Sequence, residues 1–274
     1  MDIRLIAFDL DGTLLRTDKT ISERTRRALY AAKEKGVLLV PATGRLLCSL
    51  PQELMDKELT RYFILVNGAQ IYDSALDRTL LREELTPEMT MQILRFLRTR
   101  NVVRGVYIEG SGYMGKADYA DIDAVAATPE MNALMHRVYI QTDDLEEFAK
   151  RAASTQKVLA FFRDPDEKQA VIQEISERFT GYAVSSSLGN NIEINAENAT
   201  KGKALHTLCR AIGLSPAQCM AFGDGTNDCS MLRAAGVGVA MANASEDVKA
   251  CADVVTEAND EDGLARMIER TLGL

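Results

Sequence analysis

The chain has 274 residues, of which 46% are hydrophobic and 26% are charged. This length fits one large domain or two modest ones, and the composition is that of a globular protein with a sizeable core. The net charge of −8 excludes a broad basic surface for nucleic acid, and no apolar run is long enough to predict a membrane span.

The first part of the chain alternates predicted strands and helices. The apolar run in RLIAFDL (residues 4–10) predicts a strand that is buried on both faces. A helix is expected from about 22 to 35, a strand in VLLVPATG (37–44), a helix from about 47 to 57 and a strand in FILVNG (63–68). This order predicts a parallel sheet with helices on its faces.

A different pattern runs from about residue 82 to residue 187. Its predicted strands share a stronger polar alternation, which is typical of strands with one solvated face. In order, the elements are a helix over 87–100, a hairpin over 102–116, a strand over 137–142, a helix over 144–154, a strand over 157–162, a helix over 165–179 and a strand over 182–187. We therefore expect an inserted α+β domain at 82–187.

The remaining residues return to the first pattern. In order, we expect a strand at 190–195, a helix after Thr200, a strand at 219–224, a helix at 227–236, a strand at 237–241, a helix at 245–252, a short strand at 254–256 and a final helix from Asp260. Residues 1–81 and 188–274 are therefore predicted to form one Rossmann-like α/β core, a doubly wound parallel sheet interrupted by the inserted domain.

The first predicted strand ends in DLDGT, residues 9–13. In an extended chain, residues two apart point the same way, so Asp9 and Asp11 are expected to address one cleft, and Gly12 allows a tight turn. Two close carboxylates repel each other unless a cation or a proton lies between them, which favours a hard metal ion such as Mg²⁺. The structural alternative is a solvated turn after a strand.

A second pair of carboxylates, Asp224 and Asp228, follows the apolar strand CMAF in GDGTND. Alone, this stretch is explained equally well by a Gly-Asp turn in which Asn or Asp caps the next helix. Together with Asp9 and Asp11, it predicts a metal site built from two separate strands.

Two further stretches carry groups that suit an anion. In PATGR, Thr43 offers a hydroxyl, and Thr43 and Gly44 offer backbone N–H groups at a strand end, although a plain turn also explains the stretch. In TKGKAL, Lys201 and Lys203 stand at a predicted helix start. The helix dipole disfavours cations there unless an anion is near or the side chains point into water.

Taken in this order, the four stretches resemble the signature of the haloacid dehalogenase-like hydrolase superfamily. That signature has an initial DxDG[TV], a Ser or Thr after the second strand, a later Lys and a terminal acidic GDxxxD or GDxxND. DLDGT, Thr43, Lys201 and GDGTND match it. The segment GVGVAMANASEDVKACADVVT also resembles the Cof-type branch, whose mixed α/β cap (type IIB) is inserted where 82–187 lies. The resemblance covers nearly the whole chain.

The resemblance implies a role for each matching residue. Asp9 would attack phosphorus as the nucleophile, and Asp11 would protonate the leaving alkoxide and then deprotonate the hydrolytic water. Mg²⁺ would be bound by Asp9, the Asp11 backbone carbonyl and Asp224, with Asp228 as a further ligand or as a support. The transferring phosphoryl group would be bound by the Leu10 backbone N–H, Thr43, Gly44, Lys201 and Asn227.

We therefore expect an Mg²⁺-dependent phosphatase that acts on small phosphorylated metabolites, with sugar phosphates ahead of phosphorylated cofactors such as FMN or pyridoxal phosphate. A phosphomutase or phosphotransferase would use the same motifs. A catalytically silent phosphate-sensing protein is the alternative outside enzymes, and the complete set of Asp9, Asp11, Lys201 and Asp224 argues against it.

Side chains of the inserted domain are expected to select the substrate. Tyr113, Met114 and Lys116 in GYMGK are candidates, with packing or a solvated hairpin as the alternative. The five cysteines form no C-x-x-C pair, and the N-terminus lacks the layout of a signal peptide, so free thiols in the cytoplasm are expected. A monomer and a homodimer both fit, and no nucleic-acid or membrane partner is expected.

Overall fold

The computed structural model describes residues 2–126, 128–187 and 189–274. Residues 1 and 188, the expected first residues of the two core segments, lie outside the described residues. All five cysteines are free thiols. Among the described residues, no helix has both the length and the apolar character needed to cross a membrane.

The chain folds into two compact units. We call the first the core unit, which comprises Met1–Arg45, Leu50–Arg82 and Thr200–Leu274. We call the second the cap unit, which comprises Leu46–Ser49 and Glu83–Ala199. The cap unit therefore interrupts the core unit in the sequence, as the change of pattern near residue 82 predicts.

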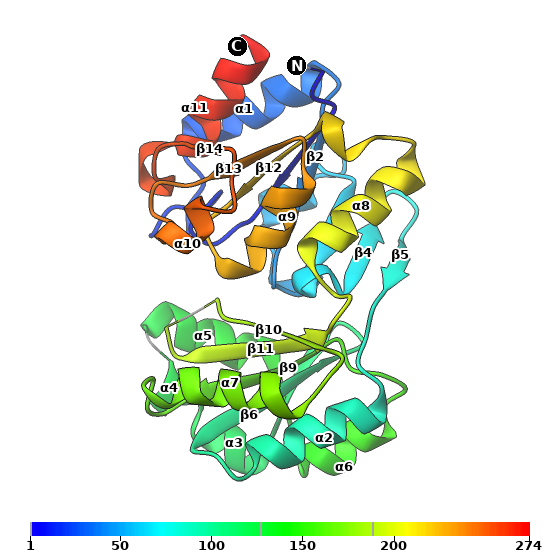
Figure 1. The fold of residues 1–274 in the computed structure, drawn as a ribbon, viewed down its shortest axis with the longest axis vertical. Helices are drawn as coiled ribbons and strands as arrows, with labels where there is room; N and C mark the ends of the chain where they lie inside the picture. The colour runs from blue at the N-terminus through cyan, green and yellow to red at the C-terminus, as the bar shows by residue number, and fades with distance from the viewer. Residues whose placement is uncertain (1, 127, 188) are drawn as a thin grey trace. The chain divides into compact units, whose positions relative to one another are not determined.

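A five-stranded parallel sheet forms the centre of the core unit (Figure 1). In spatial order, its strands are β14 (Val254–Val255), β13 (Val237–Ala240), β12 (Cys219–Gly223), β1 (Leu5–Phe8) and β2 (Leu38–Pro41). The register pairs Phe8 with Phe222 and with Pro41, so the carboxyl ends of β1, β12 and β2 are level. Residues that follow these strands therefore meet at one edge of the sheet.

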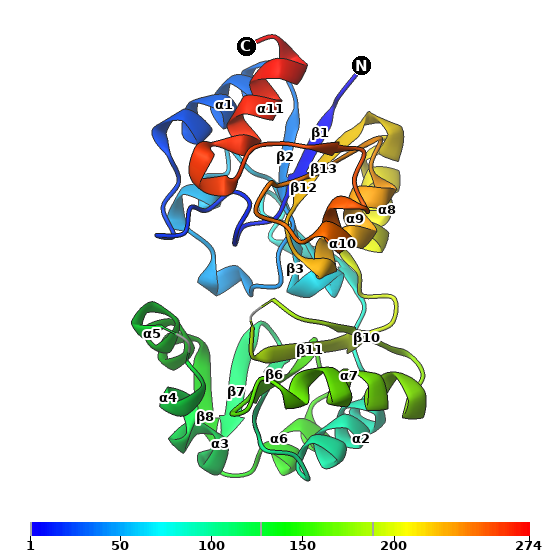
Figure 2. The ribbon, with the colours of Figure 1, turned by 60° about the vertical axis from the view of Figure 1, so that its left-hand side comes forward.

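Helices cover both faces of this sheet (Figures 1 and 2). α1 (Glu23–Glu34) and α11 (Gly263–Leu272) lie side by side on one face, and α8 (Lys201–Ile212) and α9 (Cys229–Ala234) cover the other. The short α10 (Glu246–Lys249) follows β13. Every residue of β1 is buried, as expected for a strand covered on both faces. The α/β fold class predicted from the order of strands and helices is confirmed.

Two predicted elements of the core differ in the structure. β3 (Tyr62–Leu65) begins a separate antiparallel sheet with β4 (Gln70–Asp73) and β5 (Arg78–Arg82), and isolated parallel bridges join its segment to β2. The helix expected at 47–57 is wrong, because two 3₁₀ turns stand there, η1 (Leu47–Ser49) and η2 (Gln52–Met55). Pro51 between them lacks the N–H that a continuous α-helix needs.

A six-stranded, mostly antiparallel sheet forms the cap unit. In spatial order, its strands are β10 (Tyr182–Ser185), β11 (Asn191–Ala196), β9 (Lys157–Phe162), β6 (Val102–Ile108), β7 (Ser111–Gly115) and β8 (Tyr139–Thr142). Its helices are α2 (Pro87–Leu97), α3 (Lys116–Ala120), α4 (Ile122–Val125), α5 (Pro129–Val138), α6 (Leu145–Arg151) and α7 (Glu167–Arg178). α2, α6 and α7 pack against one face of the sheet (Figure 1).

β11 corrects the expected second boundary of the inserted domain. The sequence pattern assigned this strand to the core, but β11 pairs antiparallel with β9 and β10 in the cap sheet. Its residues Ile192 and Ile194 are buried in the apolar cluster of the cap and alternate with polar residues. Such alternation is typical of an antiparallel strand. The chain therefore returns to the core unit after Ala199 rather than at 188.

The three candidate substrate contacts in the hairpin have packing or surface roles within the cap unit. Met114 is buried, and Tyr113 packs on Phe148 with ring centroids 4.4 Å apart. Lys116 forms an exposed ion pair with Asp143. The structural alternative therefore describes these residues better than substrate contact does.

Candidate active site

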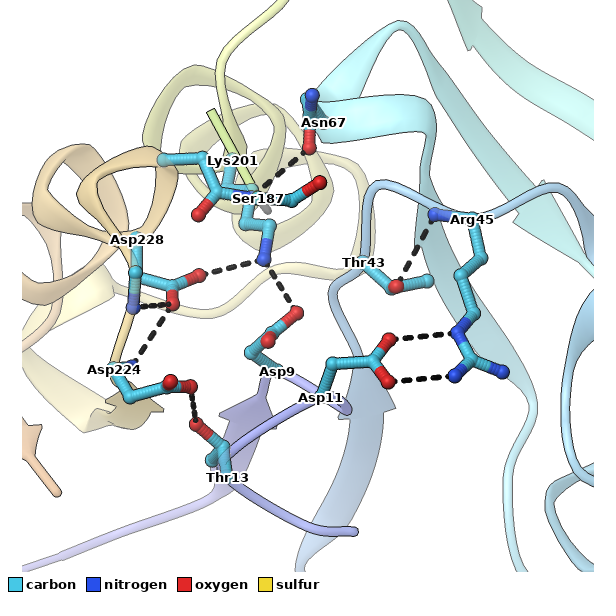
Figure 3. Close-up of polar contacts among 12 residues, drawn as sticks. Asp9, Asp11, Thr13, Thr43, Arg45, Asn67, Ser187, Lys201, Asp224 and Asp228 are labelled. Carbon is cyan, nitrogen blue, oxygen red and sulfur yellow. Dashed lines mark hydrogen bonds and ion pairs between the residues drawn. The ribbon is translucent and has the colours of Figure 1, made fainter. Parts of the chain in front are cut away.

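The residues predicted to carry the chemistry meet at the carboxyl edge of the core sheet (Figure 3). They are Asp9 and Asp11 after β1, Thr43 after β2, Lys201 in the first turn of α8, and Asp224 and Asp228 after β12. Because β1 ends at Phe8, the two aspartates of DLDGT lie in the turn after the strand rather than on its last residues.

Lys201 is completely buried and bridges two carboxylates (Figure 3). Its Nζ donates to Asp9 Oδ1 and to Asp228 Oδ1, each at 2.6 Å. Burial alone would lower the pKa of this ammonium, but the charges of Asp228 and Asp9 outweigh burial and hold the pKa above its usual range. A lysine at a helix start is disfavoured by the helix dipole unless an anion lies nearby, and the carboxylates of Asp9 and Asp228 are such anions. Lys203, by contrast, is exposed.

Three carboxylates crowd around this one ammonium. Ligand atoms of Asp9, Asp224 and Asp228 all lie within 4.8 Å of one another. Burial raises the pKa of Asp9 well above its usual range despite Lys201, and the neighbouring carboxylates raise it further. Burial also raises the pKa of Asp224 to about 6, against a hydrogen bond from Thr13 that lowers it. The excess negative charge suits a divalent cation, and carboxylate oxygens are ligands that Mg²⁺ prefers.

Asp228 is held on both of its oxygens. Oδ1 accepts from Lys201, and Oδ2 accepts from the backbone N–H groups of Asp224 and Gly225 at 3.0 and 2.9 Å. The side chain is completely buried. These contacts fix the turn that carries Asp224. The sequence leaves two roles open for Asp228, a metal ligand or a support for the ligands, and these contacts fit the support.

The turn after β1 packs directly on Asp224. Gly12 has a φ of +80°, and a Cβ at this position would lie 2.2 Å from Asp224 Oδ2, so both the backbone and the space require glycine. Thr13 Oγ1 donates to Asp224 Oδ1 at 2.7 Å. The DLDGT and GDGTND turns are therefore joined by a hydrogen bond from a residue to which sequence analysis assigned no role.

Asp11 forms a two-pronged ion pair with Arg45 (Figure 3). Arg45 Nε donates to Asp11 Oδ2 and its terminal nitrogen donates to Oδ1, both at 2.7 Å, and Lys19 adds a contact at 3.0 Å. Burial alone would raise the pKa of Asp11, but the hydrogen bonds and charges of Arg45 and Lys19 outweigh burial and lower it. This role of Arg45 was not predicted from the sequence, although the residue directly follows Thr43 and Gly44 at a strand end.

The groups expected to bind phosphate are only partly available. The Thr43 N–H donates to the Ile64 carbonyl at 2.9 Å, so the expectation that it offers this donor is wrong, because pairing toward β3 continues past the end of β2. The Thr43 hydroxyl accepts from the Arg45 N–H at 3.2 Å, a contact that does not use the hydroxyl hydrogen. Asn227 Nδ2 donates to Asn67 Oδ1 at 3.1 Å, and sequence analysis did not single out Asn67.

Comparisons with known proteins agree with this geometry. A family model for haloacid dehalogenase-like hydrolases matches residues 6–268. The 5-amino-6-(5-phospho-D-ribitylamino)uracil phosphatase YcsE of Bacillus subtilis is 30% identical over 268 residues, which cover 98% of this chain and 95% of the relative. The pyridoxal phosphate phosphatase YbhA of Escherichia coli is 30% identical over 272 residues and 98% of each chain.

A solved structure extends the similarity to the fold. The sugar phosphatase BT4131, of subclass IIB, matches with a TM-score of 0.81 and 26% identity over 98% of this chain and 99% of its own. The resemblance carried by the four stretches is therefore confirmed over both units, cap included. This chain belongs to the haloacid dehalogenase-like hydrolase family.

Proposed function

We propose that this protein is an Mg²⁺-dependent phosphatase that hydrolyses monoesters of small phosphorylated metabolites through an aspartyl-phosphate. The observation that carries the proposal is the buried ammonium of Lys201 in contact with Asp9, whose carboxylate lies close to those of Asp224 and Asp228. The relatives act on a phosphoribitylamino uracil, on pyridoxal phosphate and on sugar phosphates, according to their names, which supports a small metabolite as the substrate.

Asp9 would be the nucleophile of the first step. One of its carboxylate oxygens forms a bond to phosphorus while the bond from phosphorus to the ester oxygen breaks. Lys201 orients this carboxylate at 2.6 Å and carries positive charge beside the phosphoryl oxygens, where negative charge has to be stabilised. The Thr43 hydroxyl, the Gly44 and Leu10 N–H groups and Asn227 would bind the other phosphoryl oxygens.

Asp11 would move protons in both steps. It gives a proton to the leaving alkoxide in the first step and takes one from water when the aspartyl-phosphate is hydrolysed. Arg45 binds both oxygens of Asp11 and lowers its pKa, which favours the ionised form that the second step needs. Proton donation in the first step requires that Asp11 be protonated and that its contact with Arg45 loosen.

The acidic cluster would hold the metal. When bound, Mg²⁺ supplies positive charge that offsets the carboxylates and the phosphoryl oxygens. Asp9, Asp224 and the Asp11 backbone carbonyl would be its protein ligands, while Asp228 keeps the Asp224 turn in place through two backbone N–H groups. One ammonium does not balance three carboxylates, so the residues present fit a divalent cation.

The cap unit would select the leaving group. None of the four stretches that carry the proposed chemistry lies within Glu83–Ala199, so that unit is left to the task of distinguishing one ester from another. The same phosphoryl chemistry serves sugar phosphates and phosphorylated cofactors alike, so these esters differ only in the leaving group.

The first prediction tests the function itself. With Mg²⁺, the protein should release phosphate from members of a panel that holds sugar phosphates, pyridoxal phosphate, FMN and phosphoribitylamino uracil. Asp9→Asn keeps the shape of the side chain but loses the attacking oxygen, so it should lower turnover at least about 1,000-fold without unfolding the protein.

A matched control is Asp18→Asn, because Asp18 is an exposed aspartate just beyond the same turn. This variant should keep turnover within about threefold of the wild type. Phosphate release and circular dichroism provide the readouts. Binding of phosphate esters without any turnover would contradict the proposal and favour the sensing alternative.

The second prediction concerns metal and pH. Because the pKa of Asp224 is raised to about 6 in the folded protein, its charge destabilises the metal-free fold above that pH, and protons compete with the metal below it. Mg²⁺ should therefore raise the unfolding temperature more at about pH 8 than at about pH 5.

Activity should follow the same metal dependence. A chelator should abolish turnover, Mg²⁺ should restore it, and Ca²⁺ should restore it poorly, because Ca²⁺ takes more ligands at longer distances and would occupy the attacking oxygen of Asp9. Thermal unfolding and phosphate release measure the two effects. Full activity in chelator, or a Mg²⁺ stabilisation that grows as the pH falls, would refute this metal site.

The third prediction separates the two roles of Asp11. Asp11→Asn should lower kcat/KM for an alkyl phosphate by about 10²–10⁴-fold, because a poor leaving group needs the proton. The value for p-nitrophenyl phosphate should fall much less, since its leaving group departs as a stable anion. Asp18→Asn again serves as the control. Equal losses for both esters would rule out Asp11 as the acid of the first step.

A further inference from the structure

Two asparagines from the C-terminal part of the core unit hold the turn that carries Asp9 and Asp11. Asn243 Nδ2 donates to the Gly12 carbonyl at 2.9 Å. Asn259 Nδ2 donates to the Leu15 carbonyl, also at 2.9 Å. Both asparagines are more than 200 residues away from the turn in the sequence, at separations of 231 and 244 residues.

Three amides of the turn donate within it, and the Gly12 and Leu15 carbonyls accept from the two asparagines. The N–H groups of Thr13 and Leu15 donate to the Leu10 carbonyl at 3.3 and 2.8 Å, and the Leu14 N–H donates to the Asp9 carbonyl at 3.2 Å. These internal bonds curl the chain, and the two asparagines bind carbonyls that these three bonds do not use. Backbone carbonyls are strong acceptors, so each bond fixes the orientation of a peptide plane.

The two asparagines are also coupled to each other. The Asn259 N–H donates to Asn243 Oδ1 at 3.1 Å. The Asn243 amide therefore accepts with its oxygen and donates with its nitrogen, and both partners determine which atom is which. The loop that carries Asn259 is closed by its own bonds, from Gly263 N–H to the Ala258 carbonyl and from Thr256 Oγ1 to the Gly263 carbonyl.

The two bonds hold the turn at different places, because the Gly12 carbonyl lies between Asp11 and Thr13 and the Leu15 carbonyl lies at the end of the turn. The Gly12 carbonyl directly follows Asp11 and precedes Thr13, whose hydroxyl holds Asp224 at 2.7 Å. A rotation of this peptide plane would move the Thr13 hydroxyl relative to Asp11, because the plane joins Gly12 to Thr13. The contact of Gly12 with Asp224 leaves little room for such a rotation without loss of the site geometry.

We propose that Asn243 and Asn259 are positioning residues, a clamp that fixes the catalytic turn in the geometry needed for both chemical steps. This inference rests on the proposed function for its kinetic consequences. The clamp acts through the backbone of the turn and does not touch the phosphoryl group. Its loss should therefore lower the rate of the chemical steps more than it weakens substrate binding.

The kinetic test uses Asn243→Ala and Asn259→Ala with an alkyl phosphate and saturating Mg²⁺. Each variant should lose about 10–100-fold in kcat while KM changes less than about threefold, since a misplacement of around 1 Å is enough for a loss of that size. Asn243→Asp keeps the acceptor for the Asn259 N–H but removes the donor to Gly12, so it should lose as much as Asn243→Ala. A kcat within twofold of the wild type in both alanine variants would overturn the proposal.

Thr17→Val is the matched control. Thr17 joins the same two segments, with its N–H and its hydroxyl donating to Asp260 at 2.8 and 2.6 Å, but these bonds lie beyond the turn and touch neither carbonyl. This variant should keep kcat within about threefold. If Thr17→Val lost as much kcat as Asn243→Ala, then any weakening of the contacts between the two segments would have the same effect. That result would also overturn the proposal.

Hydrogen exchange measured without metal or substrate gives a readout independent of turnover. The amides of Thr13, Leu14 and Leu15 should exchange faster in Asn243→Ala and Asn259→Ala than in the wild type and in Thr17→Val. If the wild type hydrolyses no phosphate ester, the proposed function fails, and exchange still tests the clamp. Unchanged exchange in both alanine variants would refute it.

Discussion

The buried ammonium of Lys201, held at 2.6 Å from both Asp9 and Asp228, is the contact on which the site depends. A fully buried charge is tolerated only with partners, and removing one partner of a buried ion pair typically costs about 3–5 kcal/mol. Lys201 has two partners, which lie in the segments that follow β1 and β12, so its position requires that these strands be neighbours with level ends. The start of α8 must then lie over the same edge, which sets where the chain re-enters the core unit after the cap.

The same contact leaves the site with unbalanced charge. Asp9, Asp224 and Asp228 stand close together around one ammonium, and burial raises the pKa of both Asp9 and Asp224. Bound positive charge would offset the repulsion among these carboxylates, so the geometry suits a divalent cation and is consistent with the proposed attack on phosphorus. Asp11 is not part of this cluster, and its pKa is shifted in the opposite direction. Burial would raise this pKa, but contacts with basic side chains, chiefly Arg45, outweigh burial and lower it. The two aspartates of one short turn therefore contact different cations, Asp9 the ammonium of Lys201 and Asp11 the guanidinium of Arg45.

The sequence predicted the parts of the fold that rest on local pattern and short motifs. The apolar run at β1, the alternation of strands and helices and the strand ends of DLDGT and GDGTND were sufficient to predict the core sheet and its chemical edge. Arg45 and the engaged N–H of Thr43 were missed because both depend on pairing between segments distant in the sequence. β11 was assigned to the wrong unit because the sequence of a short strand does not specify which sheet the strand joins. The alternation of apolar and polar residues in β11 was nevertheless a signal for the antiparallel cap sheet.

The central claim is that Asp9, oriented by Lys201, forms a covalent bond to phosphorus. The most direct test is a rapid acid quench of excess Asp11→Asn protein mixed with p-nitrophenyl phosphate and Mg²⁺, followed by peptide mass spectrometry. This variant can still release the aryl leaving group but lacks the base that hydrolyses the intermediate, so a phosphate should accumulate on the peptide that contains Asp9. Release of nitrophenol with no protein-bound phosphate, or with phosphate on a peptide lacking Asp9, would contradict the account.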